Sequence, residues 1–92
     1  MLIDMNFRSL ERIIRGISNH RRIEIMALLS KKPELSLEEI SEILNINFKT
    51  GSEHIRRLAI SGMLIKRNDF HSVRHKLTSR GLQVLKFLRT LE

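Results

Sequence analysis

The side chains with the greatest capacity for chemistry in this sequence are its cations, which gather in the second half of the chain. Residues 43–91 carry ten lysines and arginines against two acids, Glu53 and Asp69, whereas seven cations and seven acids cancel in residues 1–42. A surface with such an excess can bind a polyanion, because each neutralised phosphate releases counterions. The plainer interpretation is a basic protein whose charge only keeps it in solution. Charge therefore favours a nucleic acid as partner and leaves that second interpretation open.

Groups that could perform catalysis or hold a metal ion lack the arrangement that such work needs. The sequence has no cysteine, which excludes disulfides, thiolate metal sites and cysteine redox sensing. A zinc site needs three or four converging ligands, and His20, His54, His71 and His75 are too scattered to predict one. No nucleophile elbow, phosphate-binding loop or paired carboxylate motif is present. We expect no enzyme, no metal and no cofactor.

The spacing of apolar residues predicts four helices, a β-hairpin and a fifth helix. Helix starts are marked by Asn6 or Asp4, by Ser18 or Asn19, by Ser36 with Glu39 as its capping-box partner, by Asn47 and by Thr78. The helices are expected at residues 3–17, 20–32, 36–44, 48–61 and 79–91, and the strands at 63–67 and 72–77 around the turn-forming Asn68 and Asp69.

Length and hydropathy limit where this chain acts. Its 92 residues are expected to form one domain, with no room for a separate catalytic domain. The longest apolar run, Ile25 to Leu29, is too short to span a bilayer, and Asp4 interrupts the apolar start that a signal peptide needs. We expect a cytoplasmic, nucleoid-associated protein without a membrane partner.

The predicted elements, taken in order, resemble a winged helix-turn-helix of the ArsR type. Residues 36–62 look like a helix-turn-helix, and the basic hairpin follows. Residues 17–29 are similar to the ArsR-type segment L-x-x-x-x-R-x-x-I-L-x-x-L, and Leu77-Thr78-Ser79-Arg80-Gly81 is equally similar to MarR- and PadR-like winged helices. The resemblance covers about residues 10–91. The expected fold is mostly α with a small β-hairpin, in the order α-α-α-α-β-β-α.

The resemblance implies a homodimeric transcriptional regulator that binds double-stranded DNA in a sequence-specific way. We favour a repressor, but the sequence does not decide between repressor and activator. Helix 48–61 would lie in the major groove, and the wing, residues 63–77, would reach the backbone or the minor groove. Lys49, Thr50 and Glu53 would meet base edges near the start of this helix. The other residues expected at the DNA, mainly at phosphates, are Asn47, Ser52, His54, Arg56, Arg57, Arg67, His71, Arg74 and Lys76.

The first and last helices, within residues 1–17 and 79–92, carry more apolar surface than one packed face needs. These stripes either complete the core of a monomer or form the seam of a dimer, and we favour the dimer. The expected interface residues are Ile3, Phe7, Leu10, Ile14, Leu85, Phe87, Leu88 and Leu91.

Two residues depart from the pattern of a recognition helix. Gly51 lowers helix propensity by about 1 kcal/mol; it serves close packing against the preceding helix or adaptability on DNA, or it is simply tolerated. Glu53 either selects a base or pairs with Arg57 at the i, i+4 spacing. The sequence leaves both questions open.

Many ArsR-type proteins sense metal ions, but this sequence does not contain the residues of the two sensing sites described for the family. ArsR-type sensing sites use a cysteine pair in the third helix or Asp and His on the last helix, and residues 79–92 contain neither His nor Asp. Any small-molecule effector would have to bind at the dimer interface, and its identity is unknown. Two other functions remain as alternatives: sequence-neutral architectural binding of nucleic acid, and a winged helix used for protein–protein assembly.

Overall fold

The computed structural model describes residues 4–92, which form five helices and one antiparallel hairpin. This confirms the predicted order of elements; Ile3, one of the expected interface residues, lies outside the described residues. The elements are α1 (Phe7–Ile17), α2 (His20–Lys31), α3 (Leu37–Leu44), α4 (Phe48–Ile60), β1 (Leu64–Asn68), β2 (Val73–Leu77) and α5 (Ser79–Arg89).

Every helix starts at a side chain that accepts a backbone N–H, so the starts follow from local sequence. Asn6, Asn19, Asn47 and Thr78 cap α1, α2, α4 and α5. Ser36 caps α3 and is capped in return by the carboxylate of Glu39, which completes the expected capping box. Because loss of such a cap costs about 1 kcal/mol, these residues fix where each helix enters the fold.

The core forms around α2, whose Ile25, Met26 and Leu29 are almost completely buried. The third helix adds Ile40, and the fourth adds Leu58. The remaining buried apolar residues are Ile17, Ile46, Ile55, Met63, Leu64, Leu77 and Leu85. This shared core holds the α3–α4 pair and the hairpin against the same central helix.

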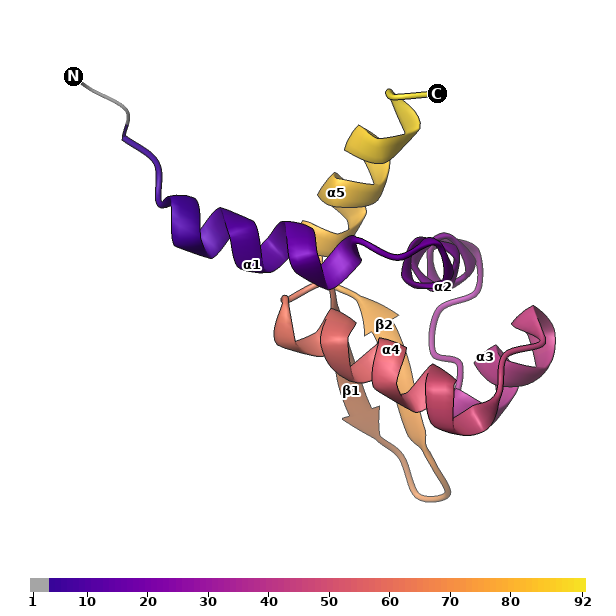
Figure 1. The fold of residues 1–92 in the computed structure, drawn as a ribbon. Helices are drawn as coiled ribbons and strands as arrows, with labels where there is room; N and C mark the ends of the chain where they lie inside the picture. Colours follow the sequence, from indigo (N-terminus) through magenta and orange to yellow (C-terminus); the bar gives the residue numbers. More distant parts are fainter. Residues whose placement is uncertain (1–3) are drawn as a thin grey trace.

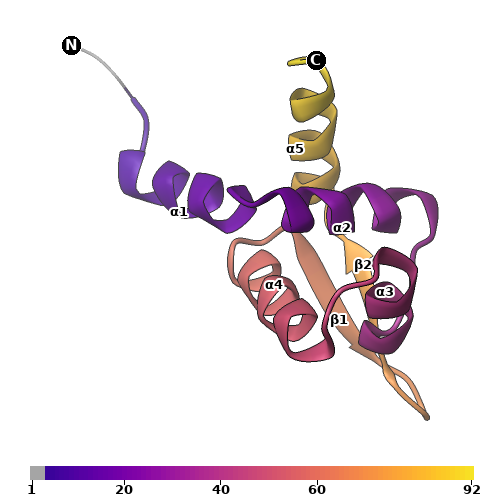
Figure 2. The same cartoon turned by 45° about the vertical axis from the view of Figure 1, so that its right-hand side comes forward.

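The two terminal helices reach one end of the molecule, and the hairpin reaches the opposite end (Figures 1 and 2). The start of α1 and the end of α5 project away from the core, and both termini lie at that end. The tip of the hairpin projects beyond α4 at the opposite end. None of the helices within residues 4–92 is long and apolar enough to cross a membrane.

Candidate nucleic-acid interface

A three-residue turn joins α3 to α4 and sets the position of the fourth helix. Asn45 adopts a left-handed conformation (φ 54°) that ends α3; asparagine tolerates this region better than most residues. Ile46 is buried and anchors the turn to the core. The Oδ1 atom of Asn47 then accepts the N–H groups of Lys49 (2.9 Å) and Thr50 (3.3 Å). The turn therefore points the exposed start of α4 into solvent.

Gly51 lies at the closest approach of α3 and α4. A Cβ atom here would sit 2.9 Å from the Oγ atom of Ser41 and 3.4 Å from Cδ1 of Leu37. Since the first distance is shorter than a normal van der Waals contact, a side chain at position 51 would require the Ser41 side chain or the helices to move. The close-packing interpretation of Gly51 is thus supported over simple tolerance.

One side of α4 is exposed and, apart from Ile60 in its last turn, polar. Its first turns present Lys49, Thr50 and Ser52, and its later turns present Glu53, Arg56 and Arg57. These six residues are the ones expected on this helix apart from His54. We call them the α4 face.

Glu53 holds both arginines of the α4 face. Its Oε1 atom accepts from Nε of Arg56 (3.0 Å), and its Oε2 atom accepts from Nη2 of Arg56 (2.8 Å) and Nε of Arg57 (3.0 Å). The hydrogen bonds from Arg56 and then Arg57 lower the pKa of Glu53 to about 2. Of the two alternatives for Glu53, the pairing with Arg57 is present, with Arg56 as an additional partner, and the selection of a base stays a prediction.

His54 does not belong to the exposed face. Only 9% of the residue is exposed, and its Nδ1 atom accepts a hydrogen bond from Nε of Arg22 on α2 (3.2 Å). Burial, followed by the charge of Arg22, lowers the pKa of the ring. The expectation that His54 contacts a phosphate is therefore wrong: the position is turned toward α2 by the helix period.

The hairpin pairs Lys66 with His75 and Arg67 with Arg74. His75 and Leu77 are buried, and Lys76 between them is exposed, as the alternation predicts, although Val73 is more exposed than expected. His75 is also more buried than the half-buried position expected. Its Nδ1 atom lies 2.9 Å from the carbonyl oxygen of Leu35. An isolated antiparallel β-bridge also joins the backbones of Leu35 and His75.

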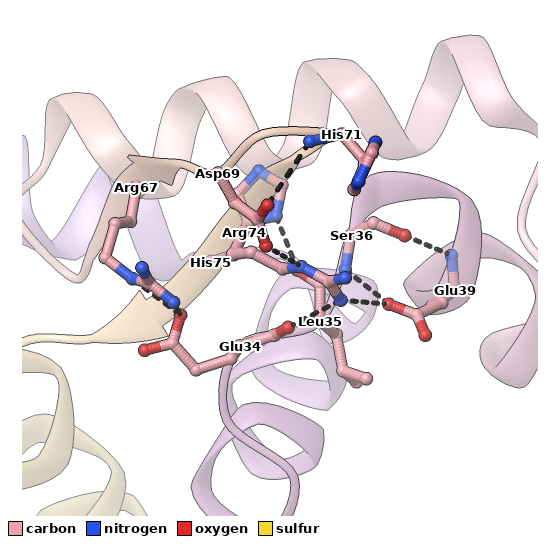
Figure 3. A network of polar contacts seen from close by, with 9 residues as sticks. All are labelled: Glu34, Leu35, Ser36, Glu39, Arg67, Asp69, His71, Arg74 and His75. Atoms are coloured by element: carbon pink, nitrogen blue, oxygen red, sulfur yellow. Dashed lines mark hydrogen bonds and ion pairs between the residues drawn. The ribbon is translucent and has the colours of Figure 1, made fainter.

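Acidic and carbonyl oxygens around the wing bind two of its arginines (Figure 3). The guanidinium of Arg74 donates to the carbonyl oxygen of Glu34 (3.2 Å) and to Oε1 of Glu39 (3.1 Å), and it lies 3.4 Å from Oδ2 of Asp69. Arg67 forms an exposed pair with the carboxylate of Glu34 (3.0 Å). These contacts tie the wing to the start of α3, and the phosphate contact expected for Arg74 stays a prediction.

The wing keeps other groups available to a ligand. Lys66 and Lys76 are exposed, and within residues 4–92 neither forms an ion pair. At the tip, Phe70 is 99% exposed, and the backbone N–H of His71 donates to Asp69. Lys66 is absent from the residues predicted at the interface. It pairs with the buried His75 across the hairpin, yet its own long side chain is exposed.

Comparison with known proteins identifies the family. The sequence model for "bacterial regulatory protein, arsR family" matches residues 19–66, just over half of the chain. The chain belongs to the arsR family. This membership confirms the resemblance drawn from sequence, and it describes a DNA-binding transcriptional regulator rather than an enzyme. No curated protein matches this arsR-family chain closely enough to count as a relative.

Solved structures share the fold of this arsR-family protein. A homodimeric winged helix-turn-helix DNA-binding domain, Mb0332 from Mycobacterium bovis, has a TM-score of 0.85 at 18% identity, covering 99% of this chain and 89% of that one. HlyU from Vibrio cholerae has a TM-score of 0.82 at 23% identity, covering 97% of both chains. The transcriptional repressor BigR from Xylella fastidiosa has a TM-score of 0.76 at 21% identity, covering 91% and 83%.

The arsR-family chain exposes apolar side chains on its two terminal helices. Phe7, Leu10 and Ile14 lie on the outer side of α1, Phe87 lies on that of α5, and Leu91 follows the end of α5. Leu82 is equally exposed and was missed as an interface residue, while Leu88 packs partly against the core. Leu85 is 5% exposed and belongs to the core of the monomer, so its assignment to a dimer seam is wrong.

Metal-binding side chains are not clustered in the described part of the chain. Within residues 4–92, no group of three or more His, Asp or Glu side chains could hold a metal ion.

Proposed function

We propose that this arsR-family protein binds specific sites in double-stranded DNA as a homodimer and represses transcription from them. The α4 face carries the proposal, because it places side chains of the types that read base edges beside cations on one exposed helix. The structurally similar Mycobacterium bovis protein is a homodimeric DNA-binding domain, and BigR is a transcriptional repressor. We extend both properties to this chain and place its action on nucleoid DNA.

In this proposal, α4 enters the major groove and the wing contacts the backbone or the minor groove. Lys49 suits the O6 and N7 acceptors of guanine, and Glu53 can accept from N4 of cytosine. Phosphates bind the amide nitrogen of Asn47, whose oxygen is occupied by the cap. They also bind Ser52, Arg56, Arg57, Arg67, His71, Lys76 and the newly found Lys66.

The first test is whether the protein selects a sequence at all. Duplexes selected from genomic fragments should bind at least about a thousandfold more tightly than random duplexes at the same salt concentration. A ratio of specific to non-specific affinity near one would instead indicate sequence-neutral architectural binding. If the protein bound no duplex, the remaining alternative would be a winged helix used for protein–protein assembly.

The second test concerns the α4 face. Replacing Arg56 and Arg57 alone would leave Glu53 without partners, so we compare E53Q/R56A/R57A with E53Q. The triple variant should weaken binding to all duplexes and reduce the salt slope, that of log K against log salt, by up to about 1.8. An unchanged slope would show that DNA binds elsewhere. K86A/R89A, on the far helix α5, serves as the charge-matched control.

A further inference from the structure

A second cationic surface lies on α1, in the half of the chain whose charges cancel in the sequence. Helical geometry places Arg8, Arg12 and Arg15 within about 60° of one another around the helix axis. Phe7, Leu10 and Ile14 occupy another sector, so the same helix has one apolar and one basic side. All three arginines are exposed.

Gly16 brings this basic side against the end of α4. A Cβ atom at Gly16 would collide with the side chain of Ser61, so only glycine permits the observed crossing of the two helices. Arg22 fixes the crossing from α2, since its Nη1 atom donates to the carbonyl oxygens of Arg15 (3.2 Å) and Gly16 (3.3 Å) at the end of α1. The position of α1 relative to α4 is thus held by packing and by hydrogen bonds.

The crossing creates a cleft of about 210 Å³ that continues the α4 face. Arg12, Arg15 and Gly16 line it from α1, and Arg57, Ile60 and Ser61 line it from the end of α4 and the residue after it. Arg57 belongs to both surfaces. The cations of α1 are therefore joined to those proposed to meet DNA, although 42 residues separate Arg15 from Arg57 in the sequence.

The charges of the side chains that line this cleft indicate which kind of ligand it could bind. Its lining contains three arginines and no acid. Arg15 pairs with Glu11 and Arg57 with Glu53, both in exposed pairs, which are weak and can exchange for a stronger anion. Within residues 4–92, Arg8 and Arg12 form no ion pair. Arg12 is the unpaired guanidinium group of the lining, and Arg8, which lies outside the cleft, extends the same basic side of α1. Guanidinium groups in this arrangement suit the oxygens of a phosphate.

We propose that Arg8, Arg12 and Arg15, together with Arg57, bind backbone phosphates of the same DNA duplex, outside the groove that α4 enters. The inference rests on the proposed function and extends its footprint onto α1. If the apolar sides of α1 and α5 meet in a dimer, this basic side stays free and faces the DNA between the two half-sites.

The test compares R8Q/R12Q with a control, K86Q/R89Q, that removes two exposed cations from α5. Losing two phosphate contacts should reduce the salt slope by up to about 1.8, equivalent to up to about 30-fold in affinity at 0.15 M salt. R8K/R12K, which keeps the charges, should restore most of the slope. Ethylation interference should show fewer essential phosphates outside the α4 groove with R8Q/R12Q than with the wild type.

Each other outcome is decisive. A salt slope of R8Q/R12Q equal to that of the control overturns the inference, and the proposed function stands as long as E53Q/R56A/R57A is impaired. A loss of affinity accompanied by a changed sedimentation coefficient also overturns it, because the arginines would then act on assembly. If the wild type binds no duplex, the proposed function fails and the inference fails with it.

Discussion

At the scale of single residues, Glu53 determines how much of the charge on α4 is available. Its two oxygens bind two guanidinium groups, and its lowered pKa keeps it ionised at every pH at which the protein would meet DNA. Exposed ion pairs of this kind contribute little to stability. Their main effects are to orient Arg56 and Arg57 and to cancel one unit of positive charge on a surface proposed to bind an anion.

We therefore expect E53Q to bind random duplexes more tightly than the wild type does. The added net charge should increase affinity up to about fivefold at 0.15 M salt and steepen the salt slope by up to about 0.9. If Glu53 also accepts from a cytosine, the ratio of specific to non-specific affinity should fall. Fluorescence anisotropy with one selected and one random duplex measures both, and an unchanged affinity for the random duplex would contradict the expectation.

His75 links the stability of the wing to pH. Burial lowers the pKa of its ring below the ordinary value, and the bond to Leu35 offsets only part of this effect. The unfolded chain then binds more protons than the folded one as the pH falls through about 6.5. The stabilisation by neutral His75 is complete above that pH and is lost below it, and His54 acts in the same direction.

H75Q should consequently flatten the decline of stability with acid. The free energy of unfolding of the wild type should fall between pH 6.5 and 5.5, with His75 contributing at most about 1.4 kcal/mol of that fall. Urea unfolding at pH 7.5, 6.5 and 5.5 tests this, with H20Q as a control at an exposed histidine. If H75Q and H20Q show the same pH dependence, His75 does not couple folding to protonation.

At the scale of elements, the crossing of α3 and α4 is tight enough to include an unsatisfied group. The Oγ atom of Ser41 is buried without a hydrogen-bond partner in the described structure, and it faces Gly51. A buried hydroxyl without a partner costs roughly 1–3 kcal/mol, and glycine within a helix costs about 1 kcal/mol relative to alanine. The two costs arise at one contact.

Replacing both residues should therefore stabilise the fold more than the single changes predict. S41A should raise the free energy of unfolding by about 1 kcal/mol, and G51A should add up to about 1 kcal/mol only once the Oγ atom is gone. The single variant G51A should gain nothing or lose stability, since its Cβ would meet that oxygen. Urea unfolding of all four proteins gives the coupling; additive effects would mean that the helices adjust to the extra methyl group.

The same elements show what sequence can predict and what it cannot. The starts of α3, α4 and α5 were correct because each depends on Ser36, Asn47 or Thr78 and on backbone within three residues. Two of the partners of Arg74, Glu34 and Glu39, were not predictable, because they lie 35 or more residues away and meet it only through the hairpin. Likewise an apolar stripe on α5 does not distinguish Leu85, which faces the core, from Phe87, which faces solvent.

At the scale of the whole molecule, the exposed apolar side chains of α1 and α5 lie apart from the cations of the α4 face and the wing, although Ile60 and Phe70 are exposed there as well. The arginines of α1 lie on another side of that helix than its apolar residues. Joining two copies through the terminal helices would cover the apolar surface and leave both cationic surfaces free. Two α4 helices related by a two-fold axis would then reach successive major grooves, and the bound site should be a near-palindrome with half-sites roughly 34–36 Å apart.

I14D tests this dimer without disturbing the monomer. Ile14 is 58% exposed, so an aspartate there stays hydrated in a single copy, but in the seam it would be a buried charge without a partner. Leu88 is a poorer choice because it packs partly against the core. I43D, at an exposed residue of α3, is the matched control.

Sedimentation at micromolar concentration should give about twice the 10.8 kDa chain mass for the wild type and I43D, and the chain mass for I14D. I14D should keep its fold by circular dichroism, and its affinity for a selected site should fall toward the non-specific level, since only one groove is then contacted. A wild-type protein that sediments at the mass of one chain would contradict the dimer and remove the reason to expect a palindrome.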